Sequence, residues 1–311
     1  MLLLNPHDKR ELSLKTIAIL GPTASGKTAL SIELALKYNA HILSLDSLSV
    51  YKEIDIASAK PTLQERQGIV HYGMDALSPH EHFDVTMFFD IYKEAHHASL
   101  QSGKNLIIVG GTGFYLKAMM EGLSQKPAIS SVVQERIDAY LLDLSVAYEL
   151  IREKDPMYAE KIASSDRYRI EKWLEIFLTT DEIPTLYLAH TKQEPLIKEV
   201  TLFEIDVPRE DLAHKIVMRT EGMVDAGLID EVFSLEKRYT RAPQCMKAIG
   251  IKEVLDYFDG KYKIPDLIER IAFNTLHLAK RQRTFNASQF PQHCKGDVAS
   301  LFGMIETHLK S

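Results

Sequence analysis

The chain has 311 residues, a formal net charge of −6 and 45% hydrophobic residues, enough for one large domain or for a core with an inserted module. Its overall acidity argues against wholesale nucleic-acid binding, and it has no apolar run as long as a membrane span, so we expect a cytoplasmic protein with no membrane partner. Cys245 and Cys294 form no C-x-x-C pair, and we expect reduced thiols rather than a disulfide or a zinc site.

The first predicted elements are a strand, a phosphate-binding loop and a helix. The apolar run Thr16–Leu20 predicts a buried strand, and the spacing of apolar residues in Ala29–Lys37 predicts a helix packed on a sheet. The residues between them match the pattern G-x-x-x-x-G-K-[ST]: Gly21, Pro22, Thr23, Ala24, Ser25, Gly26, Lys27 and Thr28. Such a loop points N–H groups at an anion, and its lysine adds positive charge. We therefore expect a di- or triphosphate ligand, with Mg²⁺ bound by the hydroxyl of Thr28.

Two further strands are predicted in the first 125 residues, and each is followed by residues suited to a site. His41–Leu45 leads into Asp46, and Asn105–Val109 runs into Thr112, which is flanked by glycines and followed by a helix. Strands separated by helices form a parallel sheet with ligands at its carboxyl edge. Asp46, Thr112 and the phosphate loop should therefore meet at one edge.

The rest of the chain is expected to be mostly helical. A helix capped by Asp84 and closed by Gly103 lies between the second and third strands, and residues 123–199 carry apolar residues at helical spacing without a strand-like run. Val200–Val207 resumes the sheet, and a last long helix starts at Ile264. The predicted fold is α/β, with a parallel-sheet core like that of P-loop nucleoside-triphosphate hydrolases. Residues 14–123 and 200–311 form this core and its helical C-terminal part, and 124–199 form a helical insertion.

Charge and motif details narrow the possible chemistry. The segment Lys237–Arg283 contains 11 Lys and Arg against 5 Asp and Glu, which is typical either of a polyanion site or of solvated helix faces. The third strand lacks the Asp that holds Mg²⁺ in many nucleoside-triphosphate hydrolases, which counts against a motor or switch ATPase. Asp46 could be a general base, a metal holder or a turn-capping residue, and the neighbouring phosphate loop favours function.

Several ordered blocks closely resemble the bacterial tRNA dimethylallyltransferase family over most of the chain, from about 16 to 285. The blocks are Gly21–Thr28, Asp46-Ser47 with Val50-Tyr51, Asp55–Pro61, Val109–Leu116, Asp225–Val232, Ala248–Val254 and Ala279–Thr284. The resemblance implies transfer of a dimethylallyl group from dimethylallyl diphosphate to N6 of adenine 37 of tRNA, with Mg²⁺ as cofactor, and we expect a monomer. It also implies that Asp46 is the base, that Thr112 donates to the bridging oxygen and that Arg219 binds the diphosphate.

The resemblance further implies tRNA contacts over the anticodon stem-loop, in part by the insertion. The implied residues are Asp46, Ser47, Leu48, Ser49, Thr112, Arg169, Lys172, Lys247, Lys252, Lys280, Arg281, Gln282 and Arg283. The chain departs from the family pattern at several of these blocks: Ser49 stands for Gln, Tyr168 for Gln, Lys172 for Arg, Phe285 for Trp, and Ala57-Ser58 for Gly-Thr.

Other classes of protein contain a phosphate loop of this kind and are alternative interpretations of the sequence. A small-molecule kinase would bind ATP and need an arginine-rich lid, which is not evident here. A prenyltransferase acting on free adenine nucleotides would need neither the helical insertion nor the basic C-terminal helix. A nucleotide-dependent RNA-binding switch is disfavoured by the missing acidic residue after Val109.

Overall fold

The computed structural model describes residues 14–290 and 292–310 and has a six-stranded parallel sheet at its centre. The strands are β1 (Thr16–Leu20), β2 (Ala40–Leu45), β3 (His71–Tyr72), β4 (Asn105–Gly110), β5 (Thr201–Ile205) and β6 (Cys294–Gly296). Their order in the sheet is β3-β2-β4-β1-β5-β6, and every pair is parallel. The predicted α/β class with a parallel sheet is confirmed.

The sequence predicted which parts of the chain are mostly helical, but it predicted the ends of the helices less accurately. They are α1 (Lys27–Lys37), α2 (Leu63–Arg66), α3 (Val85–Ser102), α4 (Gly113–Glu121), α5 (Ser131–Tyr140), α6 (Leu144–Lys154), α7 (Pro156–Ala159), α8 (Arg167–Thr180), α9 (Pro184–His190), α10 (Arg209–Asp225), α11 (Leu228–Tyr239), the 3₁₀ helix η1 (Gln244–Lys247), α12 (Ile251–Phe258), α13 (Ile264–Gln289) and α14 (Val298–Lys310). Asp84 caps α3 and Gly103 closes it in a left-handed conformation, as the sequence predicts.

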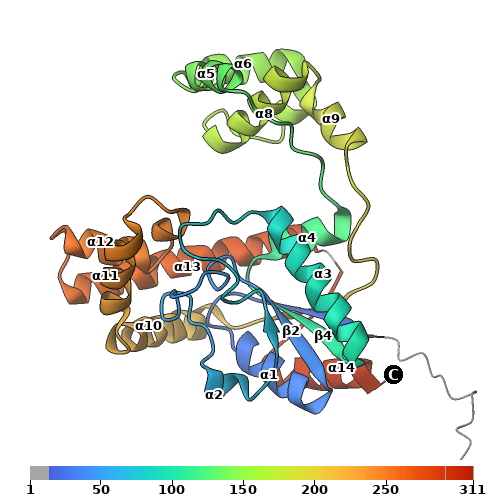
Figure 1. Cartoon of the computed structure of the whole chain (residues 1–311), viewed down its shortest axis with the longest axis vertical. Helices are drawn as coiled ribbons and strands as arrows, with labels where there is room; N and C mark the ends of the chain where they lie inside the picture. Colours follow the sequence, from blue (N-terminus) through green and yellow to red (C-terminus); the bar gives the residue numbers. More distant parts are fainter. Residues whose placement is uncertain (1–13, 291, 311) are drawn as a thin grey trace, which may run out of the picture. The chain divides into compact units, whose positions relative to one another are not determined.

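Apolar residues of the central strands are buried on both faces of the sheet, because helices cover both. On one face Ile17 and Ile19 of β1 pack in a cluster with Leu34 of α1 and Leu301 and Ile305 of α14. In Figure 1, α1 and α14 lie together beneath the sheet, whereas α3 lies on its other side. Strands covered on both faces read as continuous apolar runs, and this is why β1, β2 and β4 were visible in the sequence.

Two strands were missed. We expected only helices after residue 208, but β6 pairs with β5 at one edge of the sheet, and β3 pairs with β2 at the other. These strands have three and two residues. Such segments are too short for a period-2 pattern, and the neighbouring strand, not local sequence, determines that they pair.

Contacts divide the chain into two compact units, one of residues up to Lys117 and from Ile197 on, the other Ala118–Leu196. The second unit is helical and has its own core, where Trp173 and Ile170 of α8 pack with Ile137 of α5 and Ile151 of α6. The buried carboxylate of Asp155 accepts hydrogen bonds from the Trp173 indole at 3.1 Å and from Thr185. The apolar spacing seen in the sequence is thus the core of this unit.

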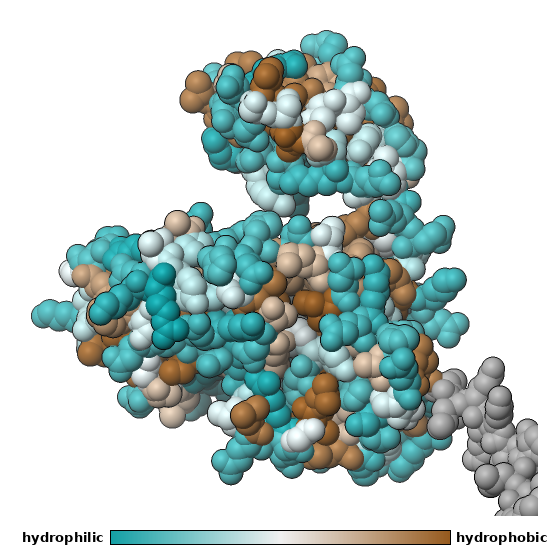
Figure 2. Space-filling model, viewed as in Figure 1, coloured by the Kyte–Doolittle hydropathy of each residue, from teal (hydrophilic) through white to brown (hydrophobic). Residues whose placement is uncertain are grey.

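Hydrophobic and hydrophilic residues are unevenly represented on the surface. Figure 2 shows a face that is largely hydrophilic, with hydrophobic residues scattered over it. Within residues 14–290 and 292–310, no helix combines the length and hydrophobicity that a membrane crossing requires. Cys245 is buried and Cys294 is exposed, and both are free thiols in this structure.

Candidate active site

The phosphate loop links the carboxyl end of β1 to the amino end of α1. Gly26 adopts φ 96°, a left-handed conformation that an L side chain rarely takes, and it forms the N-cap of α1. The helix therefore presents its unpaired N–H groups and its positive end to whatever the loop holds. The Lys27 ammonium donates a hydrogen bond to the carbonyl of Pro22 at 2.6 Å, so the lysine is folded over its own loop. A diphosphate would find these donors already converged.

Lys27 lies in an unusual electrostatic setting. Burial and the neighbouring Arg219 guanidinium lower the pKa of Lys27 to about 7, and the carboxylate of Asp46 opposes the shift. Burial also lowers the pKa of Arg219, and Asp46 again opposes the shift. Arg219 and the protonated form of Lys27, both half-buried, outweigh the one nearby carboxylate, and an added diphosphate would neutralise this excess of positive charge.

Asp46 follows β2 and is held in one orientation by its own turn. Its Oδ1 accepts the N–H groups of Leu48 at 2.8 Å and Ser49 at 3.2 Å. The turn-capping role considered for this residue is therefore real, and it does not exclude a catalytic one. Nearby on α4, burial raises the pKa of Tyr115 to about 12, with Asp46 adding to the shift, so this phenol stays neutral.

Helix α13 and a tight glycine turn close the site against the phosphate loop. The side-chain oxygen of Gln282 accepts the N–H of Thr23 at 3.0 Å. A Cβ on Gly111 would lie 2.2 Å from the Gln282 amide nitrogen, and one on Gly110 would lie 2.4 Å from the Leu45 carbonyl. Gly110, the last residue of β4, is therefore required for close packing on β2, whereas a Cβ on Gly111 would meet only the end of the flexible Gln282 side chain.

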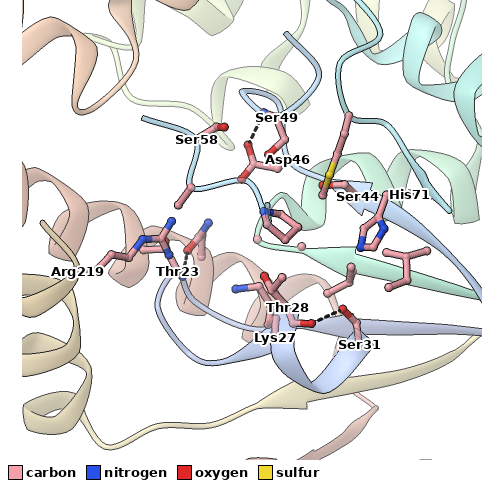
Figure 3. A pocket seen from close by; sticks show the side chains of 18 residues that line it. Thr23, Lys27, Thr28, Ser31, Ser44, Asp46, Ser49, Ser58, His71 and Arg219 are labelled. Atoms are coloured by element: carbon pink, nitrogen blue, oxygen red, sulfur yellow. Dashed lines mark hydrogen bonds between the residues drawn. The ribbon is translucent and has the colours of Figure 1, made fainter. Parts of the chain in front are cut away.

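Two cavities meet at these residues. The first, here called the loop cavity, spans about 620 Å³ including its open mouth and is lined by Lys27 and Thr28 of the phosphate loop (Figure 3). The second, the helix cavity, spans about 880 Å³ and is lined by one face of α10 and one face of α13 together with Thr112. Both are lined by Thr23, Asp46, Ser58, Arg219 and Gln282.

The shared residues identify the junction of the two cavities as the centre of the site. Arg219 donates a hydrogen bond to the Thr23 hydroxyl at 3.3 Å, and Figure 3 shows these two side chains beside each other, across from Asp46. The structure thus brings Asp46, Thr112 and the phosphate loop together, as the sheet topology suggested, and adds Arg219, which only the family resemblance implied. Ser58 was not among the site residues inferred from the sequence, although it lies inside the Asp55–Pro61 block; no local pattern distinguishes it from a turn serine.

The residues predicted to contact tRNA are placed less uniformly. Ser47 and Leu48 line the helix cavity, and Ser49 lines the loop cavity. On α13, Lys280 and Arg281 are exposed, whereas Arg283 lies 3.5 Å from Asp206 and donates to the Val207 carbonyl. Lys247 and Lys252 line neither cavity and are exposed on η1 and α12, and Arg169 and Lys172 belong to α8 of the other unit.

The residues present fit a Mg²⁺ ion held largely by a substrate. In the part of the chain that the structure describes, no group of three or more His, Cys, Asp or Glu side chains could hold a metal. Thr28 lines the loop cavity, as does Asp46, which gives a hydroxyl and one carboxylate facing the same space. Mg²⁺ is commonly bound in this way, by one or two protein oxygens together with phosphate oxygens and water.

Comparison with known proteins decides the family. A family model described as IPP transferase matches residues 49–289. The chain belongs to the IPP transferase family. It is 51% identical to a tRNA dimethylallyltransferase of Sulfurovum sp. (strain NBC37-1) over 93% of this chain and 96% of that protein. It is 52% identical to one of Aliarcobacter butzleri (strain RM4018) over 89% of this chain and 93% of that protein.

Solved structures agree with this IPP transferase assignment. A eukaryotic dimethylallyltransferase acting on tRNA matches with a TM-score of 0.77 and 28% identity, covering 88% of this chain and 70% of that one. A tRNA delta(2)-isopentenylpyrophosphate transferase from Staphylococcus epidermidis matches with a TM-score of 0.68 and 29% identity, covering 96% of this chain and 99% of that one. The family resemblance inferred from the motif order is therefore confirmed.

Proposed function

We propose that this IPP transferase moves a dimethylallyl group from dimethylallyl diphosphate to N6 of adenine 37 of tRNA, releasing diphosphate. The observation that carries the proposal is the junction of two cavities at Asp46, Thr23 and Arg219. One cavity begins at a phosphate loop and the other is lined by apolar helix faces, so an anion and a flat base can reach the same carboxylate from different sides.

The phosphate side supports the leaving group. The C1–O bond of dimethylallyl diphosphate breaks with its electron pair remaining on oxygen, so negative charge grows on the diphosphate. Lys27 and Arg219 are already positioned at the loop, and Thr112 lines the helix cavity where the bridging oxygen would lie. When bound through Thr28, Mg²⁺ would supply further neutralisation of this charge. An ion held in this way, by Thr28 and by the oxygens of the diphosphate itself, would not need the third-strand carboxylate that is missing here.

The base side supports the acceptor. The N6 nitrogen attacks C1 of the allylic group, and one of its protons passes to the Asp46 carboxylate. Because the Leu48 and Ser49 N–H groups fix Oδ1, we assign proton acceptance to Oδ2. The helix cavity is lined by Ile216, Ile271 and Leu278, which suit the faces of an unstacked purine.

The tRNA would be held largely through phosphate contacts. Lys280 and Arg281 are exposed on α13 in the same unit as the catalytic residues, and Arg169 and Lys172 of the helical insertion would add a second point of contact. Adenine 37 must leave its stack to reach Asp46, which requires a deformable single-stranded loop. Arg283 is already engaged with Val207 and Asp206, so we assign it a smaller part in tRNA binding than Lys280 and Arg281.

One assay tests the reaction against its rivals. The enzyme and labelled dimethylallyl diphosphate are incubated in three parallel reactions. These contain unmodified tRNA, AMP, or ATP plus small acceptors. Label in tRNA alone supports the proposal. Label in AMP would indicate a free-nucleotide prenyltransferase, and ATP-dependent phosphorylation of a small acceptor would indicate a kinase.

A further inference from the structure

One segment after Asp46, residues 53–61, borders every cavity of the site and is here called the wall segment. Ala57 lines the helix cavity, Ser58 lines both cavities, and Ala59 and Pro61 line the loop cavity. Ala59, Lys60 and Pro61 also line a third hollow on the outer side of the phosphate loop. The position of this one segment therefore affects the width of the site on both sides of Asp46.

The wall segment is strained. Glu53 has φ 63° and Ala59 has φ 48°, so two residues that are not glycine occupy the left-handed region near its two ends. L-residues rarely adopt this conformation, and it persists only where surrounding contacts impose it. A strained segment at the edge of a catalytic site therefore needs contacts that hold it in place.

One anchor is a carboxylate on another helix. Glu231, in the first turn of α11, accepts the N–H groups of Asp55 at 2.9 Å and Ile56 at 2.7 Å through one oxygen and that of Ala57 at 2.9 Å through the other. Three consecutive backbone N–H groups that converge on one anion form a nest, and charge-assisted hydrogen bonds of this kind are strong. The last turn of α11 adds a second contact, since the Tyr239 hydroxyl donates to Glu53 at 2.8 Å.

The other anchor is a buried lysine. The Lys60 side chain is only 2% exposed, and its ammonium donates to the Tyr51 carbonyl at 2.6 Å, to Asp55 at 2.9 Å and to Asp75 at 2.6 Å. Lys60 holds the segment from within its own loop, whereas Glu231 ties it to α11. Glu231, together with the contact between Tyr239 and Glu53, thus joins the wall segment to the helical C-terminal part.

We propose that Glu231 is a positioning residue for group transfer: by filling the nest at Asp55–Ala57 it holds Ala57 and Ser58 at the width that lets the acceptor base meet the allylic carbon. Glu231 does not touch the substrates and acts through the wall segment. The phosphate loop is held independently by Gln282 and Arg219, so the role concerns turnover rather than diphosphate binding. This inference rests on the transfer reaction proposed above.

The test is Glu231→Ala with added formate, a small anion that can enter the vacated nest. Because small misplacements at a reacting centre are costly, kcat with saturating tRNA should fall about 10- to 100-fold. The dissociation constant for dimethylallyl diphosphate should stay within about threefold of the parent, because the phosphate-loop contacts persist. Formate should restore part of kcat in this variant and leave the parent unchanged. The matched control is Asp230→Asn, which removes a charge from the same turn of α11 and should match the parent.

Glu231→Gln is the second variant, for the case in which the alanine variant does not fold. It fills the nest but keeps only one acceptor oxygen, so kcat should fall by less, and formate should have no effect. An alanine variant within threefold of the parent would overturn the proposal, as would a decrease in kcat that follows the unfolded fraction in thermal melts and does not respond to formate. If only the glutamine variant folds, an unchanged kcat in that variant would overturn the proposal. A parent enzyme with no transfer activity would refute the reaction itself, and not the anchor alone.

Discussion

Binding of dimethylallyl diphosphate should draw a proton onto Lys27. In the free enzyme, burial and Arg219 lower the pKa of this ammonium to about 7, so at neutral pH a large share of molecules carry a neutral amine. A diphosphate against Lys27 favours the charged form and returns the pKa toward the ordinary lysine value of about 10.4. Above pH 7, binding of dimethylallyl diphosphate therefore requires Lys27 to take up a proton. Because protons become scarcer as the pH rises, the affinity of the enzyme for this ligand should fall.

The size of the effect follows from the fraction of protonated enzyme. With a free-enzyme pKa of about 7, that fraction is about one half at pH 7 and about one hundredth at pH 9, so the affinity should fall about 50-fold over this range. A terminal phosphate is already largely ionised above pH 7, since its last pKa is near 6, so the ligand contributes little to this trend. Lys27→Met should bind weakly at every pH and show no such slope.

Calorimetry without tRNA measures this directly, because no turnover occurs. Titrations in two buffers with different ionisation enthalpies give the number of protons taken up, which should approach one at pH 8 in the parent and zero in Lys27→Met. An affinity that stays constant from pH 7 to pH 9, with no proton uptake, would refute the electrostatic reasoning about this site.

Three further predictions concern the base, the basic helix and the glycine turn. Asp46→Asn should keep most tRNA binding while single-turnover transfer falls about 10²- to 10⁴-fold, the usual contribution of a general base; a near-normal rate would remove Asp46 from that role. The double variant Lys280→Ala/Arg281→Ala should bind tRNA more weakly. Its slope of log affinity against log salt should flatten by roughly one unit or less for each phosphate that is no longer bound. A double variant that binds like the parent at every salt concentration would show that this part of α13 is an ordinary solvated helix face. Gly110→Ala forces a Cβ against the Leu45 carbonyl and should lower the unfolding free energy by about 1–3 kcal/mol in denaturant melts. Gly222→Ala, with open space on α10, should be neutral or stabilising, and equal effects of the two variants would contradict the close packing of β4 on β2.

The sequence predicted those parts of the site that depend on sheet topology. Polar residues that follow parallel strands meet at the carboxyl edge of the sheet. The sequence alone therefore placed Asp46, Thr112 and the phosphate loop together. The same reasoning could not find the hydrogen bond between Gln282 and Thr23, since 259 positions separate the two residues and the docking of α13 alone brings them together.

Other features were hidden because they depend on burial. Lys60 and Glu231 look like surface charges in the sequence, yet one is enclosed by two carboxylates and the other fills a backbone nest. Arg283 belongs to a basic run that suggested RNA binding, but in the folded chain it lies against Val207 and Asp206. Long-range partners determine what such charged side chains do, and local patterns do not reveal them.

The most direct test of the proposed transfer is nucleoside analysis of a tRNA transcript with adenine at position 37, incubated with purified enzyme and dimethylallyl diphosphate in the absence of ATP. We expect N6-(dimethylallyl)adenosine at position 37 and an equimolar amount of diphosphate. Unmodified tRNA, or a modification that appears only with stoichiometric cleavage of ATP, would contradict the transfer reaction.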